Sequence, residues 1–388
     1  MRTIRQIYVL VIFAVILSAC RGQAVSPSPL PPTSTNDALR STLIFKSTSQ
    51  PALSTLPPTD IFVPETPQPI NSGPSLGQVP TPAPDPLRFV FPTPGPAPVS
   101  AWRPPLYTVP WSPTPFDHFY FVSPIAADVV NWPLADYRYG GVFFADVVHT
   151  GVDIPAPKGT PVLAAGPGKV IWAGYGVYRG GNDPSDPYGL AVTIRHDFGY
   201  QDQALYTVYG HLDRVDVVEG QYVETGEPLG LVGETGKVTG PHLHFEVRLG
   251  SNDYYTTRNP ELWLVPPIGW GVLAGRVLGS DGTLLAGQLF TIHSLASDGN
   301  WFARSYGNNT ANSDPYYREN LVVGDLPAGI YEIRTAYVGL SFITQIVIRP
   351  GEVSYFTFHG RYDFKVGLPP TPGSDFNQSI EKTPTHTP

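Results

Sequence analysis

Short apolar runs separated by glycine and turn residues recur from about residue 120 to residue 264. The runs that carry this pattern are "GTPVLAAGPGKVIWAG", "YGLAVTIRHD", "ALYTVYGHL" and "VEGQYVETGEPLGLVG". Their apolar stretches have the length of β-strands, and the glycines between them are typical of hairpin connections. None of them sustains a 3.6-residue period, so we expect little helix. The pattern predicts a glycine-punctuated antiparallel β-sheet domain over residues 118–266.

A second β-rich unit is predicted over residues 270–361. In "GDLPAGIYEIRTAYVGL" the alternation places one set of side chains on a single strand face: Tyr331, Ile333, Thr335 and Tyr337. Roughly 90 residues of short strands suit a small β-sandwich. The unit resembles the carboxypeptidase regulatory-like domains in its Gly-x-Val strand, its Asp-Gly turn and its late "LPAGIY", which implies a supporting or binding role. The predicted fold class is therefore mainly β, with residues 362–388 as a disordered tail.

Proline dominates the chain before these two domains. Residues 24–115 hold 24 of the 45 prolines, and proline removes backbone hydrogen-bond donors. Few stretches here show hydrophobic periodicity, so residues 21–117 are predicted to form a disordered linker without a packed core. Its aromatic end, residues 102–119, is the part that could instead pack on the following domain.

The first 20 residues predict export from the cytoplasm. Arg2 and Arg5 precede an apolar run at residues 7–17, which is typical of a signal peptide and too short for a permanent membrane span. The run ends in "LSAC", which resembles the lipobox of bacterial lipoproteins and implies lipidation of Cys20, the only cysteine of the chain. Two or more acyl chains would anchor the protein stably. We therefore expect a membrane-anchored lipoprotein of the cell envelope.

Charge narrows the range of partners. The chain carries 24 Lys and Arg against 32 Asp and Glu, a net charge of −8 at pH 7. A nucleic-acid-binding protein normally shows a basic stripe, so we expect no nucleic-acid partner.

The stretch "GPHLHFEV" carries the first candidate chemistry. Successive strand residues point to opposite faces, so one face presents four polar side chains: His242, His244, Glu246 and Arg248. The other face is apolar and must be the core side. Two imidazoles therefore project in parallel from one strand, which is weak evidence for a metal site when it stands alone.

The segment "HTGVDI" supplies partners for this pair. It places His149 and Asp153 four residues apart, and in the strand or loop that the surrounding Gly, Val, Ile and Pro favour, both share a face. Two histidines and one carboxylate form a three-ligand set for Zn²⁺ that leaves the fourth position to water. One histidine of the "HLH" pair is then spare, and His211 in "YTVYGHL" is a further one.

Three segments in this order resemble the lysostaphin and LytM type of zinc endopeptidase, which cuts peptide cross-links in bacterial peptidoglycan. They are "HTGVDIPAPKGTPVLAAGPGKV", "YGHL" and "TGPHLHFEV". The resemblance covers residues 138–262, about a third of the chain. It implies peptidoglycan stem peptides or cross-bridges as the substrate and one zinc ion per chain.

The resemblance also implies a role for each polar residue. His149, Asp153 and His244 correspond to the metal ligands, and His211 and His242 correspond to the uncoordinated catalytic pair. Which of the two is the general base stays open, as does the kind of cross-link that is cut. The remaining histidines have no ligand partner at useful spacing, and His196 is expected to be a turn or packing residue.

Two other functions stay open beside the hydrolase. One is a catalytically silent relative that activates a separate cell-wall amidase or acts as a scaffold, and the presence of all five polar residues argues against it. The other is an adhesion or carbohydrate-binding protein that uses the C-terminal unit. The loop at residues 174–189, rich in Gly, Pro and Asp, is expected either to wall the substrate groove or to be a solvated insertion.

Overall fold

The structure, a computed structural model, describes residues 103–131, 134–144, 147–307 and 310–369. All of these belong to one compact unit, residues 79–388. The predicted signal peptide, Cys20 and most of the predicted proline-rich linker lie outside the described residues. Among the described residues, no helix combines the length and the apolar character that crossing a bilayer requires.

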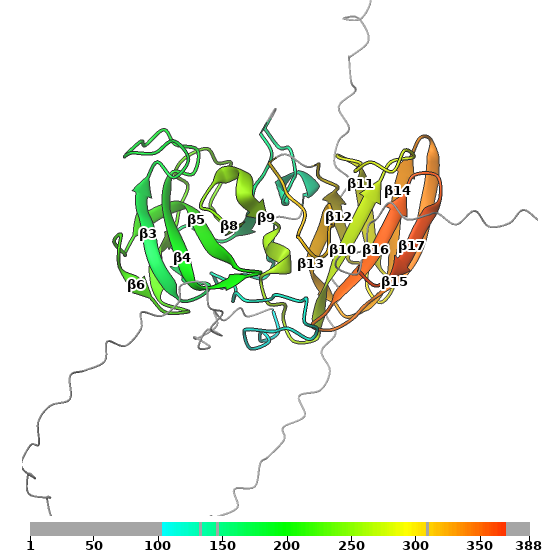
Figure 1. Ribbon diagram of the computed structural model, residues 1–388, viewed down its shortest axis with the longest axis horizontal. Coiled ribbons are helices and arrows are strands. Elements are labelled where there is room, and N and C mark those ends of the chain that lie inside the picture. Colours follow the sequence, from blue (N-terminus) through cyan, green and yellow to red (C-terminus); the bar gives the residue numbers. More distant parts are fainter. Residues whose placement is uncertain (1–102, 132–133, 145–146, 308–309, 370–388) are drawn as a thin grey trace, which may run out of the picture. The chain divides into compact units, whose positions relative to one another are not determined.

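The first half of the described chain forms a nine-stranded antiparallel sheet (Figure 1). Its main path runs in the order β1-β8-β5-β4-β3-β6, with β2, β7 and β9 paired at its side. The strands are β1 (Val152–Pro155), β2 (Pro161–Leu163), β3 (Gly168–Tyr175), β4 (Leu190–Tyr200), β5 (Gln203–Val215), β6 (Tyr222–Val223), β7 (Pro228–Val232), β8 (His242–Leu249) and β9 (Thr257–Arg258).

Two four-stranded sheets follow, in the orders β13-β10-β16-β17 and β12-β11-β14-β15. One cluster of buried side chains draws on both sheets, including Val277, Ile292, Ile333 and Phe356. The strands are β10 (Trp270–Leu278), β11 (Leu289–Ser294), β12 (Asn300–Arg304), β13 (Leu321–Pro327), β14 (Gly329–Tyr337), β15 (Leu340–Ile348), β16 (Val353–His359) and β17 (Asp363–Gly367). We call residues 270–367, which contain these two sheets and their connecting loops, the C-terminal unit.

The mainly β fold class is confirmed. The described helices are 3-10 turns of three residues: η2 (Ala135–Tyr137), η3 (Tyr254–Thr256) and η4 (Pro260–Leu262). The alternation expected for the strand at 329–337 is also observed, since Tyr331, Ile333 and Thr335 are buried. The likeness of the C-terminal unit to carboxypeptidase regulatory-like domains stays a prediction.

Two predicted domain limits are wrong. The C-terminal unit does not end at residue 361, because β17 pairs with β16 as far as Gly367. The linker does not extend to residue 117, because its aromatic end packs on the domains, as the alternative interpretation expected. Trp111 donates its indole N–H to the carbonyl of Gly351 (2.7 Å) and stacks on Tyr107. Packing of the aromatic side chains therefore fixes this end of the segment. Its proline content alone had assigned it to the linker.

Strand β8 lies in the main path of the nine-stranded sheet, between β1 and β5. All eight of its residues are buried, and its apolar side chains join the main core: Leu243, Phe245, Val247 and Leu249. Its polar side chains therefore occupy the opposite face, as the period-two alternation predicts. This strand positions both His242 and His244 on a rigid element.

Candidate metal centre and its cleft

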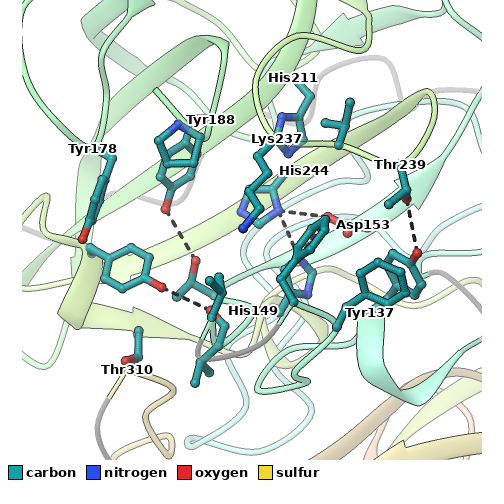
Figure 2. A pocket seen from close by; sticks show the side chains of 18 of the residues that line it. Tyr137, His149, Asp153, Tyr178, Tyr188, His211, Lys237, Thr239, His244 and Thr310 are labelled. Atoms are coloured by element: carbon teal, nitrogen blue, oxygen red, sulfur yellow. Dashed lines mark hydrogen bonds and ion pairs between the residues drawn. The ribbon is translucent and has the colours of Figure 1, made fainter. Parts of the chain in front are cut away.

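The five sequence-predicted polar residues converge at one place on the nine-stranded sheet. Asp153 on β1 stands opposite His244 on β8 in the strand register, and Gly210, which precedes His211 on β5, pairs with His244 from the other side. His149 lies just before β1. Figure 2 shows His149, Asp153, His211 and His244 around one end of a cleft.

Three of them bring ligand atoms together. Asp153 Oδ1 lies 2.9 Å from His149 Nε2 and 2.9 Å from His244 Nδ1, and the two nitrogens are 3.1 Å apart. Tetrahedral zinc with bonds of about 2.0–2.2 Å separates its ligand atoms by about 3.3 Å. The observed spacing therefore fits a zinc ion with small outward shifts of the side chains. Within the described part of the chain, no other trio of potential ligands is this close.

The charges around these atoms favour a cation. Burial alone lowers the pKa of His244, but its contacts with Asp153 and Glu246 outweigh burial and raise the pKa to about 9. Burial raises the pKa of Asp153, yet His149, His242 and His244 hold it well below its ordinary value. Two buried carboxylates thus stabilise positive charge at the point where the ligand atoms meet.

A second layer of buried groups surrounds His244. Its Nε2 lies 3.1 Å from Glu246 Oε1, which leaves Nδ1 to face the ligand cluster. The Glu246 carboxylate also accepts hydrogen bonds from Arg248 Nε (2.7 Å), from the Tyr188 hydroxyl (2.5 Å) and from the Thr150 hydroxyl. A carboxylate on the outer nitrogen of a ligating histidine fixes its tautomer and raises its basicity.

Sequence reasoning placed Glu246 on the correct face but assigned it no role. The spacing H-x-H-x-E along one strand was the available signal. Tyr188 and Thr150 were missed, and no local pattern marks them, because they reach Glu246 from two loops.

The other two histidines each direct ring nitrogen Nδ1 at a backbone carbonyl. His211 Nδ1–H donates to the carbonyl of Thr235 (2.9 Å), and His242 Nδ1–H donates to the carbonyl of Gly240 (2.8 Å). Because a carbonyl can only accept, the neutral form of each ring carries its proton on Nδ1 and a lone pair on Nε2. The ring centroids lie 4.8 Å apart.

Both the pKa and the backbone conformation of His211 are unusual. Burial first, and then the neighbouring His244 and His242, lower its pKa to about 3. Its φ of 65° lies in the left-handed region, which non-glycine residues rarely adopt and which concentrates at functional sites. The backbone N–H of His211 donates to Tyr188 O (2.8 Å), which holds this conformation.

The cleft beside these residues has a volume of about 460 Å³. Its walls are rich in apolar and aromatic side chains, including Phe143, Phe144, Val147, Tyr178 and Tyr254. Lys237 also lines it, with its ammonium group 4.2 Å from the ring centroid of Phe144. Among the described residues, no carboxylate forms an ion pair with Lys237.

The loop at residues 174–189 forms one wall of the cleft rather than a solvated insertion, since Tyr178, Arg179 and Tyr188 line the cavity. The buried carboxylate of Asp186 organises it by accepting the backbone N–H groups of Tyr178 (3.0 Å), Arg179 (2.8 Å) and Tyr188 (3.0 Å). The loop therefore has a defined conformation built from its own residues.

Two of the remaining histidines, His196 and His118, are buried inside the fold. His196 is buried within β4, where its ring contacts Pro167 O and the Thr207 hydroxyl, so it packs in a strand. His118 does have a carboxylate partner, contrary to expectation, because its Nε2 lies 3.0 Å from Asp314 Oδ2. That pair involves the C-terminal unit, which spacing along the sequence could not reveal.

Comparisons with known proteins agree with this geometry. Residues 147–256 match the family model described as Peptidase family M23. DD-carboxypeptidase/endopeptidase Mpg of Neisseria meningitidis is 38% identical over 128 residues, which are 33% of this chain and 26% of that protein. Peptidoglycan DD-endopeptidase ShyB of Vibrio cholerae is 43% identical over 102 residues, which are 26% of this chain and 20% of that protein. The match thus spans about a quarter of the length of these relatives.

Among solved structures, the catalytic domain of lysostaphin from Staphylococcus simulans matches with 29% identity and a TM-score of 0.27. The match covers 32% of this chain and 85% of that one. Residues 147–256 are thus similar to Peptidase family M23, which supports the peptidase part of the predicted resemblance.

Proposed function

We propose that the protein is a zinc-dependent endopeptidase that hydrolyses peptide cross-links of bacterial peptidoglycan through a metal-activated water. The observation that carries this proposal is the convergence of ligand atoms from His149, Asp153 and His244 within 4.8 Å of one another, beside two further imidazoles. The descriptions of the relatives as peptidoglycan DD-endopeptidases support the choice of substrate.

His149 Nε2, Asp153 Oδ1 and His244 Nδ1 would hold the ion. Zinc in such a site lowers the pKa of a bound water to about 7 and polarises a substrate carbonyl. Glu246 keeps the His244 ring oriented, because it occupies the outer ring nitrogen.

His211 and His242 would handle protons. The ring that acts as base accepts a proton from the attacking water on Nε2 and returns it to the departing amine, a contribution of roughly 10²–10⁴-fold. The other ring, when protonated on Nε2, donates a hydrogen bond to the oxygen that becomes negative as the peptide bond is attacked. The Thr235 and Gly240 carbonyls fix both rings by binding Nδ1–H.

The cleft suits a short peptide with small apolar side chains and a free carboxylate. Its walls are mostly apolar, and Lys237 offers an exposed ammonium that has no carboxylate partner among the described residues. Peptidoglycan stem peptides combine both features. We further propose that lipidated Cys20 and the linker tether the enzyme outside the cytoplasm, which the lipobox-like "LSAC" supports.

A direct test uses the protein without residues 1–20, loaded with zinc and incubated with purified peptidoglycan. Mass analysis of the released fragments should show cleaved cross-links, and His149→Ala should release none. If the zinc-loaded protein leaves every cross-link intact but stimulates a separate amidase, the activator function is correct instead.

A further inference from the structure

The position of His149 depends on the segment that precedes it, because His149 lies outside the strands. Its backbone is held by two hydrogen bonds: Gly140 N–H donates to His149 O (2.7 Å), and His149 N–H donates to Gly141 O (2.9 Å). The turn at Gly140 and Gly141 therefore fixes the place from which the His149 side chain reaches the ligand cluster.

This turn is packed against the C-terminal unit. Gly140 has a φ of 78°, and a Cβ atom added to it would lie 2.3 Å from Tyr306 Cβ. Tyr306 thus lies directly on the backbone of the turn, which only glycine permits. Tyr306 is 2% exposed and shares a small buried cluster with Tyr139 and Ala311, against which Val148 packs.

Neighbouring contacts fasten the same segment to the C-terminal unit. Arg138 Nε–H donates to Phe302 O (3.0 Å), and the backbone N–H of Asn312 donates to the Tyr139 hydroxyl (2.8 Å). The rings of Tyr139 and Tyr306 meet edge to face with centroids 5.1 Å apart. Arg138 and Tyr139 are 6% and 2% exposed, so these contacts are shielded from water.

We propose that the C-terminal unit is a positioning element of the metal site, with Tyr306 as the positioning residue that acts through Gly140 on His149. The proposal rests on the proposed function, since it takes His149 as a metal ligand. Functional constellations require ligands to be held within about 0.5 Å of their working positions. Here a residue more than 150 positions away along the chain supplies that support.

The alternative is that the C-terminal unit only adds general stability. Tyr331 provides the matched control, because it is 1% exposed, lies in the core of the same unit and does not line the turn. Tyr306→Ala and Tyr331→Ala both remove a buried ring, so both should lower the melting temperature. Only Tyr306→Ala should disturb the metal site.

The experiment measures the zinc dissociation constant of each full-length variant by competition with a chromophoric chelator. Tyr306→Ala should weaken zinc binding by about tenfold, at the low end of the effect of losing an outer support of a metal ligand. Tyr331→Ala should stay within about twofold of the parent protein in the same assay. Unchanged zinc affinity in Tyr306→Ala, or an equal loss in both variants, would overturn the proposal.

If Tyr306→Ala does not fold, a second pair of variants tests the positioning role. Gly140→Ala and Gly159→Ala both place a side chain at positive φ (78° and 88°), but a Cβ at Gly159 meets nothing within 4 Å. Only Gly140→Ala should weaken zinc binding. His149→Ala distinguishes an error in the proposed metal site from an error in the proposed positioning role. If it binds zinc normally, the metal site itself is wrong, and if it loses zinc while the Tyr306 and Gly140 variants do not, only the positioning role is wrong.

Discussion

At the scale of single residues, the site depends on buried polar groups that satisfy one another. Glu246 is fully buried and connects His244 to Arg248, Tyr188 and Thr150. Removing one partner of a buried ion pair leaves the other charge uncompensated, which costs about 3–5 kcal/mol. Glu246 should therefore influence both folding and metal binding.

Glu246→Gln tests this influence. The substitution keeps the size of the side chain but removes the charge that stabilises His244 as a ligand, so zinc affinity should fall by about 10–100-fold. Chelator competition gives the affinity, and urea denaturation gives the free energy of unfolding. The control is Glu332→Gln, which breaks an exposed pair with Arg334 on β14. Equal zinc affinities of the two variants would contradict the role of Glu246.

His211→Ala separates proton transfer from metal binding. The variant removes a group that we assign to proton handling and no ligand, so it should retain one zinc ion while its rate of cross-link cleavage falls by roughly 10²–10⁴-fold. Metal analysis and a cleavage assay on the same sample provide both readouts. Loss of zinc from this variant would mean that ligand and base have been exchanged in the assignment.

At the scale of elements, the 174–189 loop derives its conformation from one carboxylate. Asp186 accepts three backbone N–H groups of the loop. Asp186→Ala leaves these donors without their partner, so the free energy of unfolding should fall by about 1–3 kcal/mol, and the amides of Tyr178 and Arg179 should exchange faster with solvent. Asn182→Ala, at an exposed position of the same loop, is the control and should change both quantities little.

The strands of the site could be predicted from the sequence, because a period of two assigns each residue of β8 to a face without knowledge of its neighbours. The second layer could not, because Tyr188 and Thr150 meet Glu246 only through the paths of two loops. The same reason hid the partners of His118 and Gly140, which come from the C-terminal unit. Proline content misplaced residues 103–117, since aromatic packing of Trp111 and Tyr107 decides their structure.

At the scale of the whole molecule, a buried titratable cluster joins the segment that precedes the nine-stranded sheet to the C-terminal unit. His118 lies 3.0 Å from Asp314, and Tyr317 donates its hydroxyl to Asp117. Glu319 accepts hydrogen bonds from the Tyr306 hydroxyl and from Asp314 N–H. Burial first, and then the charge of Asp314, raise the pKa of Glu319 from 4.5 to about 7.

This raised pKa predicts a dependence of stability on pH. The folded state holds a proton on Glu319 more tightly than the unfolded state, so the stabilising contribution is complete below about pH 4.5 and is lost as the pH rises through about 7. Glu319→Gln has no such proton. The difference in unfolding free energy between the parent protein and this variant should shift against the parent by on the order of 1–3 kcal/mol between about pH 5 and pH 8. Parallel pH profiles would contradict this prediction.

The exposed ammonium of Lys237, set over the ring of Phe144, makes ionic strength a probe of the natural cross-link. Attraction between this group and an acidic stem peptide is screened as the Debye length shrinks from about 30 Å at 0.01 M salt to about 3 Å at 1 M. An uncharged glycine bridge would be drawn into the cleft equally at both concentrations. The salt dependence of substrate binding would therefore distinguish an acidic stem peptide from an uncharged glycine bridge as the natural substrate.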